Sequence, residues 1–331
     1  MEDILVFDVV SRDLVYSVKF GSLADIPAGD FYIIDRNVLQ HVGSLPNSVI
    51  VDATEELKSY AGIPHVLIQL INLGLKKHHT IVAIGGGITQ DLTAHIAAIY
   101  MRGITWKFVP TTLLAMADSC IGSKSSINFL GYKNLIGTFK APAEIVICTD
   151  FLSTLNSQDI KSGLAEIVKL FIIAGSSPQY IKERIQNITA DLIEEALLIK
   201  KVYVEHDEFD TGMRKVLNYG HCFGHAIETA TDYKIPHGIA VAMGMDIVNG
   251  ISPDFKADYA PILQDLYRDY MTVSWDIETV LDAMTKDKKM TNTVNIIAPL
   301  DYEVRLQQYI NDDTTWNLFK QYLKEFKDAS M

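Results

Sequence analysis

Cysteine is scarce in this sequence, and its cysteines lie too far apart to form a metal or redox motif. The 331 residues include three, Cys120, Cys148 and Cys222, with no CxxC pair among them. This spacing argues against a disulfide framework and against a zinc site made of thiolates. We expect reduced thiols, which are typical of cytoplasmic proteins.

Long apolar runs and an excess of positive charge are also lacking, and we expect no secretory signal at the start of the sequence. No stretch of 18 residues is both apolar and uncharged, so no membrane span is expected. The opening MEDILVFDVV carries acids where a secretory signal needs basic residues. The chain has 41 acidic and 29 basic residues and a formal net charge of −12, which disfavours nucleic acid or an anionic membrane as its main partner. We therefore expect a soluble cytoplasmic protein.

The first 150 residues are rich in alternating strand-like and helix-like segments. Strand patterns occur at 30–39, 48–53, 79–87, 106–115 and 143–151, with helical patterns at 63–77 and 91–103. Such alternation predicts a mostly parallel sheet covered by helices. Beyond residue 150 the segments 157–173, 191–207, 220–233 and 237–250 have helical period. The sequence thus predicts an α/β domain over 1–150 and a helical domain over 151–331.

A run of three glycines, Gly85, Gly86 and Gly87, ends one buried strand, and Asp91 follows in the next helix. Glycines at such a place let the backbone approach a phosphate, while the helix N-terminus supplies N–H donors. The pattern is not GxGxxG, because Gln90 occupies the last position. Alone, it fits a nucleotide site and an ordinary tight turn equally well.

Two further segments concentrate polar side chains. In the first, hydroxyls and a carboxylate follow a strand, where ligands gather in open α/β sheets, although a capped helix start explains them too. The second is rich in glycine and serine, and its basic and amide groups suit a phosphate or carboxylate, with a solvated loop as the alternative. These residues are Thr111, Thr112 and Asp118 in the first segment, and Lys124, Asn128, Lys133 and Asn134 in the second.

Histidines form the strongest local signal. His221 and His225 are four residues apart, which places both imidazoles on one helix face, and Glu166 and His237 are further candidates. A catalytic zinc ion takes three protein ligands and keeps one position open, and a set of histidines with a carboxylate fits it. Spacing alone selects His221 and His225 as the ligand pair, whereas an isolated histidine is more often structural.

Taken together, these segments resemble 3-dehydroquinate synthases and their relatives, the sugar phosphate cyclases. Nine motifs occur in the family's order between about residues 80 and 290: GGGITQD, YMRG, PTTLLAMADS, GSKSSIN, KNLIG, GLAEIVK, DEFDTGMRKVLNYGHCFGHAIE, HGIAVAMG and DKK. The resemblance implies a Rossmann-like NAD-binding α/β domain, then an all-α metal-binding domain, with the active site between them.

The resemblance also implies roles for individual residues. It moves the metal site to Glu166, His221 and His237 and assigns His225 to the substrate phosphate. The implied NAD contacts are Asp35, Asn37, Glu55, Lys58, Gly86, Gly87, Asp91, Thr111, Thr112 and Lys133. The implied substrate contacts are Asp118, Lys124, Asn134, Lys169, Lys200, Arg214, Asn218, His225, Lys288 and Lys289. Arg102 would reach the phosphate in a neighbouring subunit, which implies a homodimer.

The implied activity is that of a phosphate-eliminating cyclase, a carbon–oxygen lyase of the shikimate pathway. It would convert 3-deoxy-D-arabino-heptulosonate 7-phosphate to 3-dehydroquinate by transient NAD oxidation, phosphate elimination, reduction and intramolecular aldol closure, with zinc or another divalent metal such as cobalt. Lys200 and Arg214 match the family's pair for a substrate carboxylate. The alternatives are a cyclase of another sugar phosphate, a metal-dependent polyol or glycerol-phosphate dehydrogenase of the same fold, and a non-catalytic binding protein.

The sequence departs from the family pattern at three places. Ile239 stands where the pattern HGEAVA has an acid, two residues after His237. Gly122-Ser123-Lys124 replaces GGK, and the loop between the metal-binding helices is shorter than is common. Because outer-sphere acids orient metal-bound imidazoles, Ile239 predicts a changed environment for the metal.

Overall fold

The structure, a computed structural model, describes residues 5–130, 132–288, 292–300 and 302–329. The chain divides into two compact units, of which unit 1 comprises 1–156 and 189–210 and unit 2 comprises 157–188 and 211–331. The sequence analysis predicts one domain boundary near residue 150, and the chain first passes from unit 1 to unit 2 between residues 156 and 157. The return of 189–210 to unit 1 is not visible in the helical pattern of that segment.

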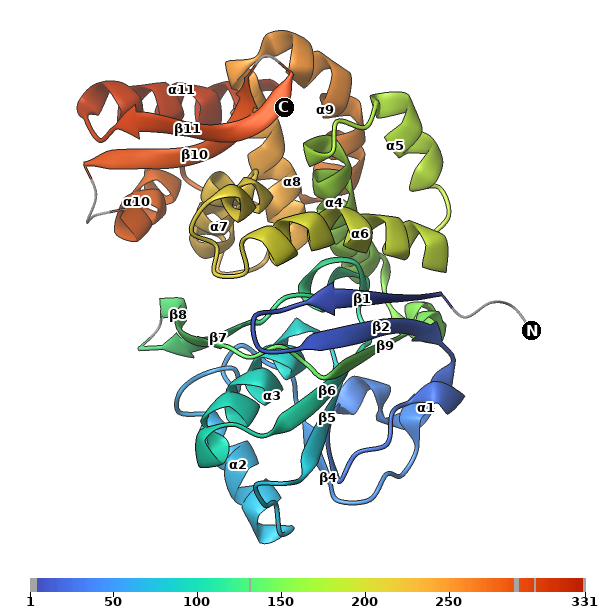
Figure 1. Cartoon of the computed structure of the whole chain (residues 1–331). Coiled ribbons are helices and arrows are strands. Elements are labelled where there is room, and N and C mark those ends of the chain that lie inside the picture. The colour runs from blue at the N-terminus through green and yellow to red at the C-terminus, as the bar shows by residue number, and fades with distance from the viewer. Residues whose placement is uncertain (1–4, 131, 289–291, 301, 330–331) are drawn as a thin grey trace. The chain divides into compact units, whose positions relative to one another are not determined.

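Unit 1 is built on a seven-stranded sheet with the order β1-β2-β9-β6-β5-β3-β4 (Figure 1). The β1 and β2 strands are antiparallel, and every other neighbouring pair is parallel. This confirms the mostly parallel α/β fold. The strands are β1 (Val6–Val10), β2 (Val15–Gly21), β3 (Phe31–Asp35), β4 (Ser48–Val51), β5 (Thr80–Gly85), β6 (Thr105–Pro110) and β9 (Glu144–Cys148).

The central strands of this sheet are buried on both faces, as parallel strands covered by helices require. Ile33 in β3, Ile81 in β5 and Phe108 in β6 are fully buried. The helix α3 (Gly87–Ile99) packs against these three strands, and α2 (Ile63–Asn72) packs against β4. The short helix α1 (Leu39–Val42) follows β3. Parallel packing brings the carboxyl ends of β3, β5 and β6 to one edge of the sheet, where ligands bind in such folds.

Two further elements complete unit 1. The segment that we expected to be a glycine-rich loop forms an antiparallel hairpin of β7 (Lys124–Phe129) and β8 (Tyr132–Phe139). The β7 strand alternates buried Ser125 and Ile127 with more exposed neighbours, and this period of two outweighs the glycine and serine content. The long helix α6 (Ala190–His206) is capped by Thr189, whose side chain accepts a hydrogen bond from the Leu192 N–H at 3.2 Å.

Unit 2 is mainly helical, as predicted. Its central helix, α8, is buried on every side and apolar except for Asp246, with Gly238 through Val248 all buried, because α4, α7 and α9 surround it. No helix in the described ranges is long and apolar enough to cross a membrane. The helices are α4 (Ser157–Ile173), α5 (Pro178–Arg184), α7 (His221–Ala230), α8 (His237–Val248), α9 (Pro253–Tyr267), α10 (Ile277–Lys288) and α11 (Asp313–Ala329).

Unit 2 also contains a hairpin, so a wholly helical domain was too simple an expectation. The strands β10 (Thr293–Leu300) and β11 (Glu303–Ile310) pair antiparallel along their whole length. β10 is largely buried, whereas β11 alternates exposed and half-buried residues. Polar side chains such as Arg305 and Gln307 interrupt the apolar pattern of β11, which hides the strand from a reading of periodicity.

Candidate functional site

Three helices of unit 2 bring Glu166, His221 and His237 together. Glu166 lies in the middle of α4, while His221 and His237 are the first residues of α7 and α8. The Nε2 atoms of His237 and His221 lie 3.4 and 3.8 Å from Glu166 Oε1. Donor atoms about 2.0–2.2 Å from a tetrahedral zinc ion stand about 3.3–3.6 Å apart. The first separation falls in this range and the second lies just outside it, so the three groups fit one divalent ion.

His225 offers a fourth group beside these three. It lies one turn after His221 on α7, and the ligand nitrogens of His221, His225 and His237 lie within 4.8 Å of one another. Two sets of three ligands therefore share His221 and His237. Glu166 is 1% exposed, whereas His225 is exposed. A deeply buried carboxylate requires a compensating cation more than an exposed imidazole requires a metal, which favours Glu166 as the third ligand.

The charge state of Glu166 fits this assignment. Burial alone would raise the pKa of Glu166, but the Lys169 ammonium and the neighbouring histidines hold it well below its usual range. Lys169 forms an ion pair with Glu166 Oε2 one helical turn away. Neither carboxylate oxygen accepts a well-directed hydrogen bond from any described residue. A cation bound at Oε1 would satisfy this buried charge.

Each of the two histidines has an outer partner at its second ring nitrogen. His221 Nδ1 lies 3.1 Å from the carbonyl oxygen of Tyr219, and His237 Nδ1 lies 3.0 Å from Glu228 Oε2. Such partners fix the proton on Nδ1 and leave Nε2 available to a metal. The sequence analysis missed Glu228. Its place seven residues after His221, two turns along the same face of α7, is the signal that could have identified it.

Several of the residues predicted to bind NAD lie at or just after the carboxyl ends of β3, β5 and β6. The Asp35 side chain accepts a hydrogen bond from the Asn37 N–H at 3.0 Å, and burial raises the pKa of Asp35. Gly86 immediately precedes α3, and a Cβ there would come 3.0 Å from the Thr112 side chain. The N–H of Thr111 donates to the Gly85 carbonyl, joining the two loops at 3.0 Å.

Five predicted residues meet in one polar network of unit 1. Lys58, 7% exposed, lies 3.5 Å from Asp91 Oδ2 and 3.6 Å from Glu55 Oε2. Its ammonium also donates to Asn134 Oδ1 at 3.1 Å, and Lys133 pairs with Glu55 at 3.1 Å. Burial raises the pKa of Asp91 in spite of Lys58. Asn134, which the resemblance assigns to the substrate, therefore lies among residues that it assigns to NAD.

Two more predicted residues of unit 1 are lysines, and each forms an ion pair with an aspartate. Lys200 on α6 lies 2.9 Å from Asp118 Oδ1 and donates to the Asp118 carbonyl at 2.6 Å. Asp118 stands in η4 (Ala115–Ser119), a π-helical turn of a kind common at functional sites. Lys124 pairs with Asp210 at 2.5 Å. The sequence analysis missed Asp210, although it lies in the quoted motif DEFDTGMR.

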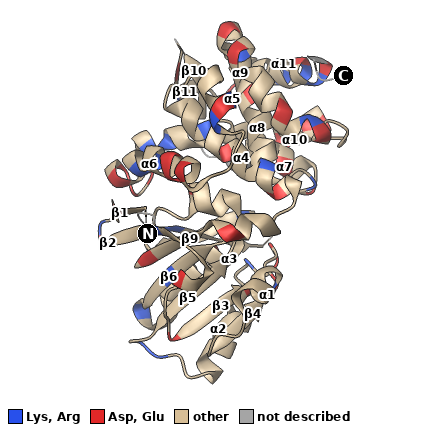
Figure 2. Cartoon of the chain, turned by 90° about the vertical axis from the view of Figure 1, so that its right-hand side faces the viewer, with Lys and Arg blue, Asp and Glu red and all other residues tan. Residues whose placement is uncertain are grey.

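The remaining predicted residues are more scattered. Arg214 is buried and Asn218 exposed in the turn η6 (Met213–Asn218), and Arg102 is exposed in η3 (Tyr100–Arg102). The α10 backbone reaches Lys288, but the Lys288 side chain and the whole of Lys289 lie outside the described residues. Acidic and basic residues are interspersed on helices of both units (Figure 2).

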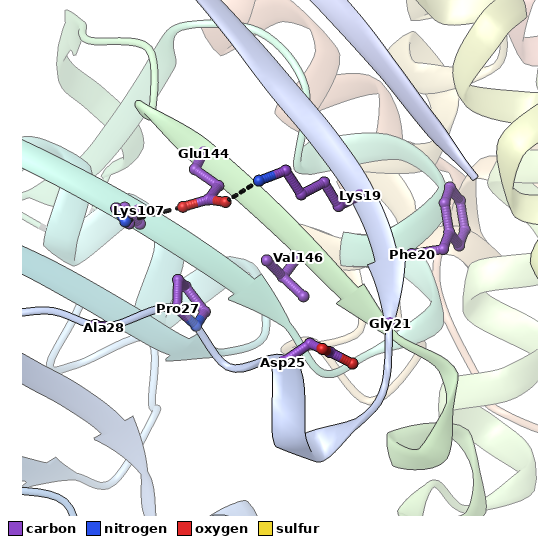
Figure 3. Close-up of a pocket in the computed structure, with 9 residues that line it drawn as sticks. All are labelled: Lys19, Phe20, Gly21, Asp25, Pro27, Ala28, Lys107, Glu144 and Val146. Atoms are coloured by element: carbon purple, nitrogen blue, oxygen red, sulfur yellow. Dashed lines mark hydrogen bonds and ion pairs between the residues drawn. The ribbon is translucent and has the colours of Figure 1, made fainter. Parts of the chain in front are cut away.

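A cavity of about 320 Å³ occurs elsewhere in unit 1 (Figure 3). Lys19, Lys107 and Glu144 line it from neighbouring strands. Both ammonium groups are already paired with the Glu144 carboxylate, at 2.6 and 2.9 Å. None of the residues that line this cavity belongs to the predicted site.

Comparison with known families gives two matches. The model described as 3-dehydroquinate synthase N-terminal matches residues 48–162, and the one described as 3-dehydroquinate synthase C-terminal matches residues 160–290. A 3-dehydroquinate synthase of Pyrococcus furiosus is 37% identical over 269 residues, covering 77% of this chain and 78% of its own. Another, of Endomicrobium trichonymphae, is 34% identical over 324 residues and 90% of each chain.

Among solved structures, the fold is similar to that of a 2-deoxy-scyllo-inosose synthase. That enzyme was crystallised with carbaglucose-6-phosphate, NAD⁺ and Co²⁺. It is 23% identical, with a TM-score of 0.79 over 97% of this chain and 99% of its own. At this level of identity, the likeness establishes the shared fold.

Proposed function

This chain belongs to the 3-dehydroquinate synthase family, and we propose that it converts 3-deoxy-D-arabino-heptulosonate 7-phosphate to 3-dehydroquinate and phosphate. The observation that carries the proposal is the buried Glu166 carboxylate facing Nε2 of both His221 and His237. The motifs that carry these residues resemble the family's metal-binding motifs, and the chain is similar to a curated synthase over 90% of its length, which supports the proposal.

Each cofactor would be held by residues within one unit. Glu166, His221 and His237 of unit 2 would hold a divalent metal, zinc or cobalt. The glycine turn before α3, with Asp91 and Thr112, would border NAD in unit 1. When bound, NAD would accept and return a hydride while the metal polarises the oxygen at the reacting carbon.

The cationic side chains suit a phosphorylated sugar acid. Arg214 is buried, and a buried guanidinium can bind a carboxylate through two parallel hydrogen bonds. Lys200 would share that carboxylate. Lys124 would orient the substrate together with Asn134, and His225 would contact its phosphate. A fixed ammonium or imidazolium near the departing phosphate stabilises the charge that develops there.

The backbone around Arg102 supports its proposed role in a homodimer. Arg102 is exposed, at a φ of +63°, and no ion pair or hydrogen bond joins its side chain to the other described residues. An arginine presented outward in this way can bind a phosphate that belongs to a second copy of the chain. The protein would then act as a homodimer in which each subunit completes its neighbour's site.

A phosphate-release assay over a panel of sugar phosphates, with NAD and Zn²⁺ or Co²⁺, tests the proposal. We expect release from the heptulosonate phosphate without net accumulation of NADH, and loss of release in His237→Ala. Release only from hexose or other heptose phosphates would identify a different cyclase. NADH accumulation with a polyol would identify a dehydrogenase, and inactivity with both cofactors bound would contradict the proposal.

A further inference from the structure

The surroundings of His237 differ on the two sides of its ring. Nε2 lies 3.4 Å from Glu166 Oε1, on the side where the metal ligands meet, while Nδ1 lies 3.0 Å from Glu228 Oε2. The Glu228 side chain is 8% exposed and that of His237 is 35% exposed, so the carboxylate is the more buried of the two partners. His237 is thus held between two carboxylates that belong to different helices, α4 and α7.

The two histidines of the proposed metal site have unlike outer partners. His221 Nδ1 faces a neutral acceptor, the Tyr219 carbonyl, whereas His237 Nδ1 faces an ionisable one. A carboxylate at Nδ1 selects the tautomer whose Nε2 lone pair is free for a metal and makes that nitrogen a stronger donor. Of the two imidazoles, His237 is therefore the one whose ligand strength depends on an acidic side chain.

Position 239 offers no such acid. Ile239 is fully buried in α8. Among the residues with described contacts, the carboxylate at His237 Nδ1 comes from Glu228 alone. We propose that Glu228 is the positioning residue of His237, fixing its tautomer and orientation for metal binding in this chain, which has isoleucine at 239. The inference rests on the proposed metal-binding function.

The Glu228 side chain can be altered without removing the main-chain bonds around it. The Glu228 carbonyl accepts hydrogen bonds from the Tyr233 N–H at 2.9 Å and from the Thr231 hydroxyl at 3.2 Å. Both involve the backbone of Glu228. Glu228→Gln keeps the size of the side chain and an oxygen that can accept from Nδ1, and it removes the charge. Glu228→Ala removes the acceptor as well.

The test measures the affinity of the full-length protein for Co²⁺ and Zn²⁺ by competition with a chromophoric chelator, together with the visible spectrum of bound Co²⁺. Loss of an outer-sphere partner typically weakens metal binding about 10- to 100-fold. We expect a loss in this range for Glu228→Ala and a smaller one for Glu228→Gln, with an altered Co²⁺ spectrum in both. Asp246→Asn is the matched control, because it replaces a buried acid on α8 that bonds Tyr267 at 2.5 Å.

A second comparison separates positioning from general support of the fold. In a His237→Ala background, the additional effect of Glu228→Ala on metal affinity should disappear, since there is no imidazole left to orient. Metal affinities of both Glu228 variants equal to the wild-type value would overturn the inference while leaving the proposed function intact. A persistent additional loss in the His237→Ala background would overturn it too. Failure of the wild-type protein to bind either metal would instead contradict the proposed function.

Discussion

At the scale of single residues, the turn that carries Arg102 combines strain with a local clamp. Met101, Arg102 and Gly103 have φ values of +47°, +63° and +110° in succession. A non-glycine residue held in such a conformation costs about 1–3 kcal/mol and persists only where its surroundings impose it. The Lys77 ammonium donates to the Met101 carbonyl at 2.9 Å and also to the Gly103 carbonyl. Lys77 therefore holds the turn closed.

Replacing Lys77 tests whether this clamp presents Arg102 correctly. Lys77→Met should lower kcat/KM about tenfold, or about 1.4 kcal/mol of transition-state stabilisation, because the turn relaxes and Arg102 is no longer directed outward. Lys76→Met is the control, since the Lys76 side chain is exposed and adjacent. Steady-state phosphate release measures both variants. Wild-type kinetics for Lys77→Met, alongside an inactive Arg102→Ala, would show that the clamp is dispensable.

The cysteines provide a second prediction at this scale. Burial raises the pKa of Cys120 to about 12 and that of Cys148 to about 11, so both remain thiols at pH 8, whereas the thiolate is the reactive form. Cys222 is only partly buried. Titration of the native protein with a thiol reagent at pH 8 should modify Cys222 first and the other two only after unfolding. The rapid phase should vanish in Cys222→Ser, and its survival there would contradict this assignment.

At the scale of elements, the position of α8 depends on close contact between backbones. A Cβ on Gly244 would come within 2.0 Å of the Gly220 carbonyl oxygen, and one on Gly238 would come within 1.9 Å of the Ser162 carbonyl oxygen. These glycines let α8 touch the start of α7 and the first half of α4. The same contacts set the distances among the three helices that supply Glu166, His221 and His237.

Adding a methyl group at this contact should loosen the metal site. Gly244→Ala should lower the free energy of unfolding by about 1–3 kcal/mol, the usual cost of overpacking, and should also weaken metal binding. Gly250→Ala is the matched control, because its Cβ would meet nothing closer than the Tyr322 ring at 3.5 Å. Urea denaturation of the metal-free proteins gives the stabilities. Equal midpoints for both variants would mean that the helices can shift without loss.

The elements also mark where sequence reasoning succeeds. Strands such as β3 and β5 were predictable because parallel strands covered on both faces are almost continuously apolar, as FYII and IVAI are. The hairpins β7–β8 and β10–β11 were not, because glycine and serine in the first and polar residues in the second interrupt the pattern. A strand that pairs with one neighbour leaves a weaker signal in composition than one at the centre of a sheet.

At the scale of the whole molecule, the residues predicted to bind NAD and those predicted to bind the metal lie in different units. The candidate NAD residues lie in unit 1, whereas Glu166, His221 and His237 all lie in unit 2. Hydrogen–deuterium exchange should therefore slow upon addition of NAD in residues 85–91 and 111–118, and upon addition of Zn²⁺ in residues 163–169 and 219–228. At a Zn²⁺ concentration just sufficient to saturate the wild-type protein, His237→Ala should lose most of the zinc effect, because its metal affinity is lower, and should keep the NAD effect. Protection of the same segments by either ligand alone would contradict this division.

The candidate site was only partly accessible to sequence reasoning. Periodicity along one helix pairs His221 with His225, since it compares residues within a single element. Glu166 and His237 join His221 through the packing of α4 and α7 on α8, which local spacing does not encode. The residue pattern offered them as further candidates, and only the family resemblance selected them over His225. Asp210 and Glu228 bond to predicted residues from other segments, so their importance emerges from the fold.

The interleaving of the two units has a consequence for inheritance and engineering. The segment 189–210, with Lys200 in α6, is encoded between two stretches that fold into the other unit. A single recombination point therefore cannot exchange one unit for its counterpart from a homologue. Junctions at 156/157, 188/189 and 210/211 are needed together. A chimaera with only the first junction would join a sheet from one parent to an α6 from the other, replacing the partner of Asp118. Natural recombination within such a gene should thus favour transfer of the whole coding sequence.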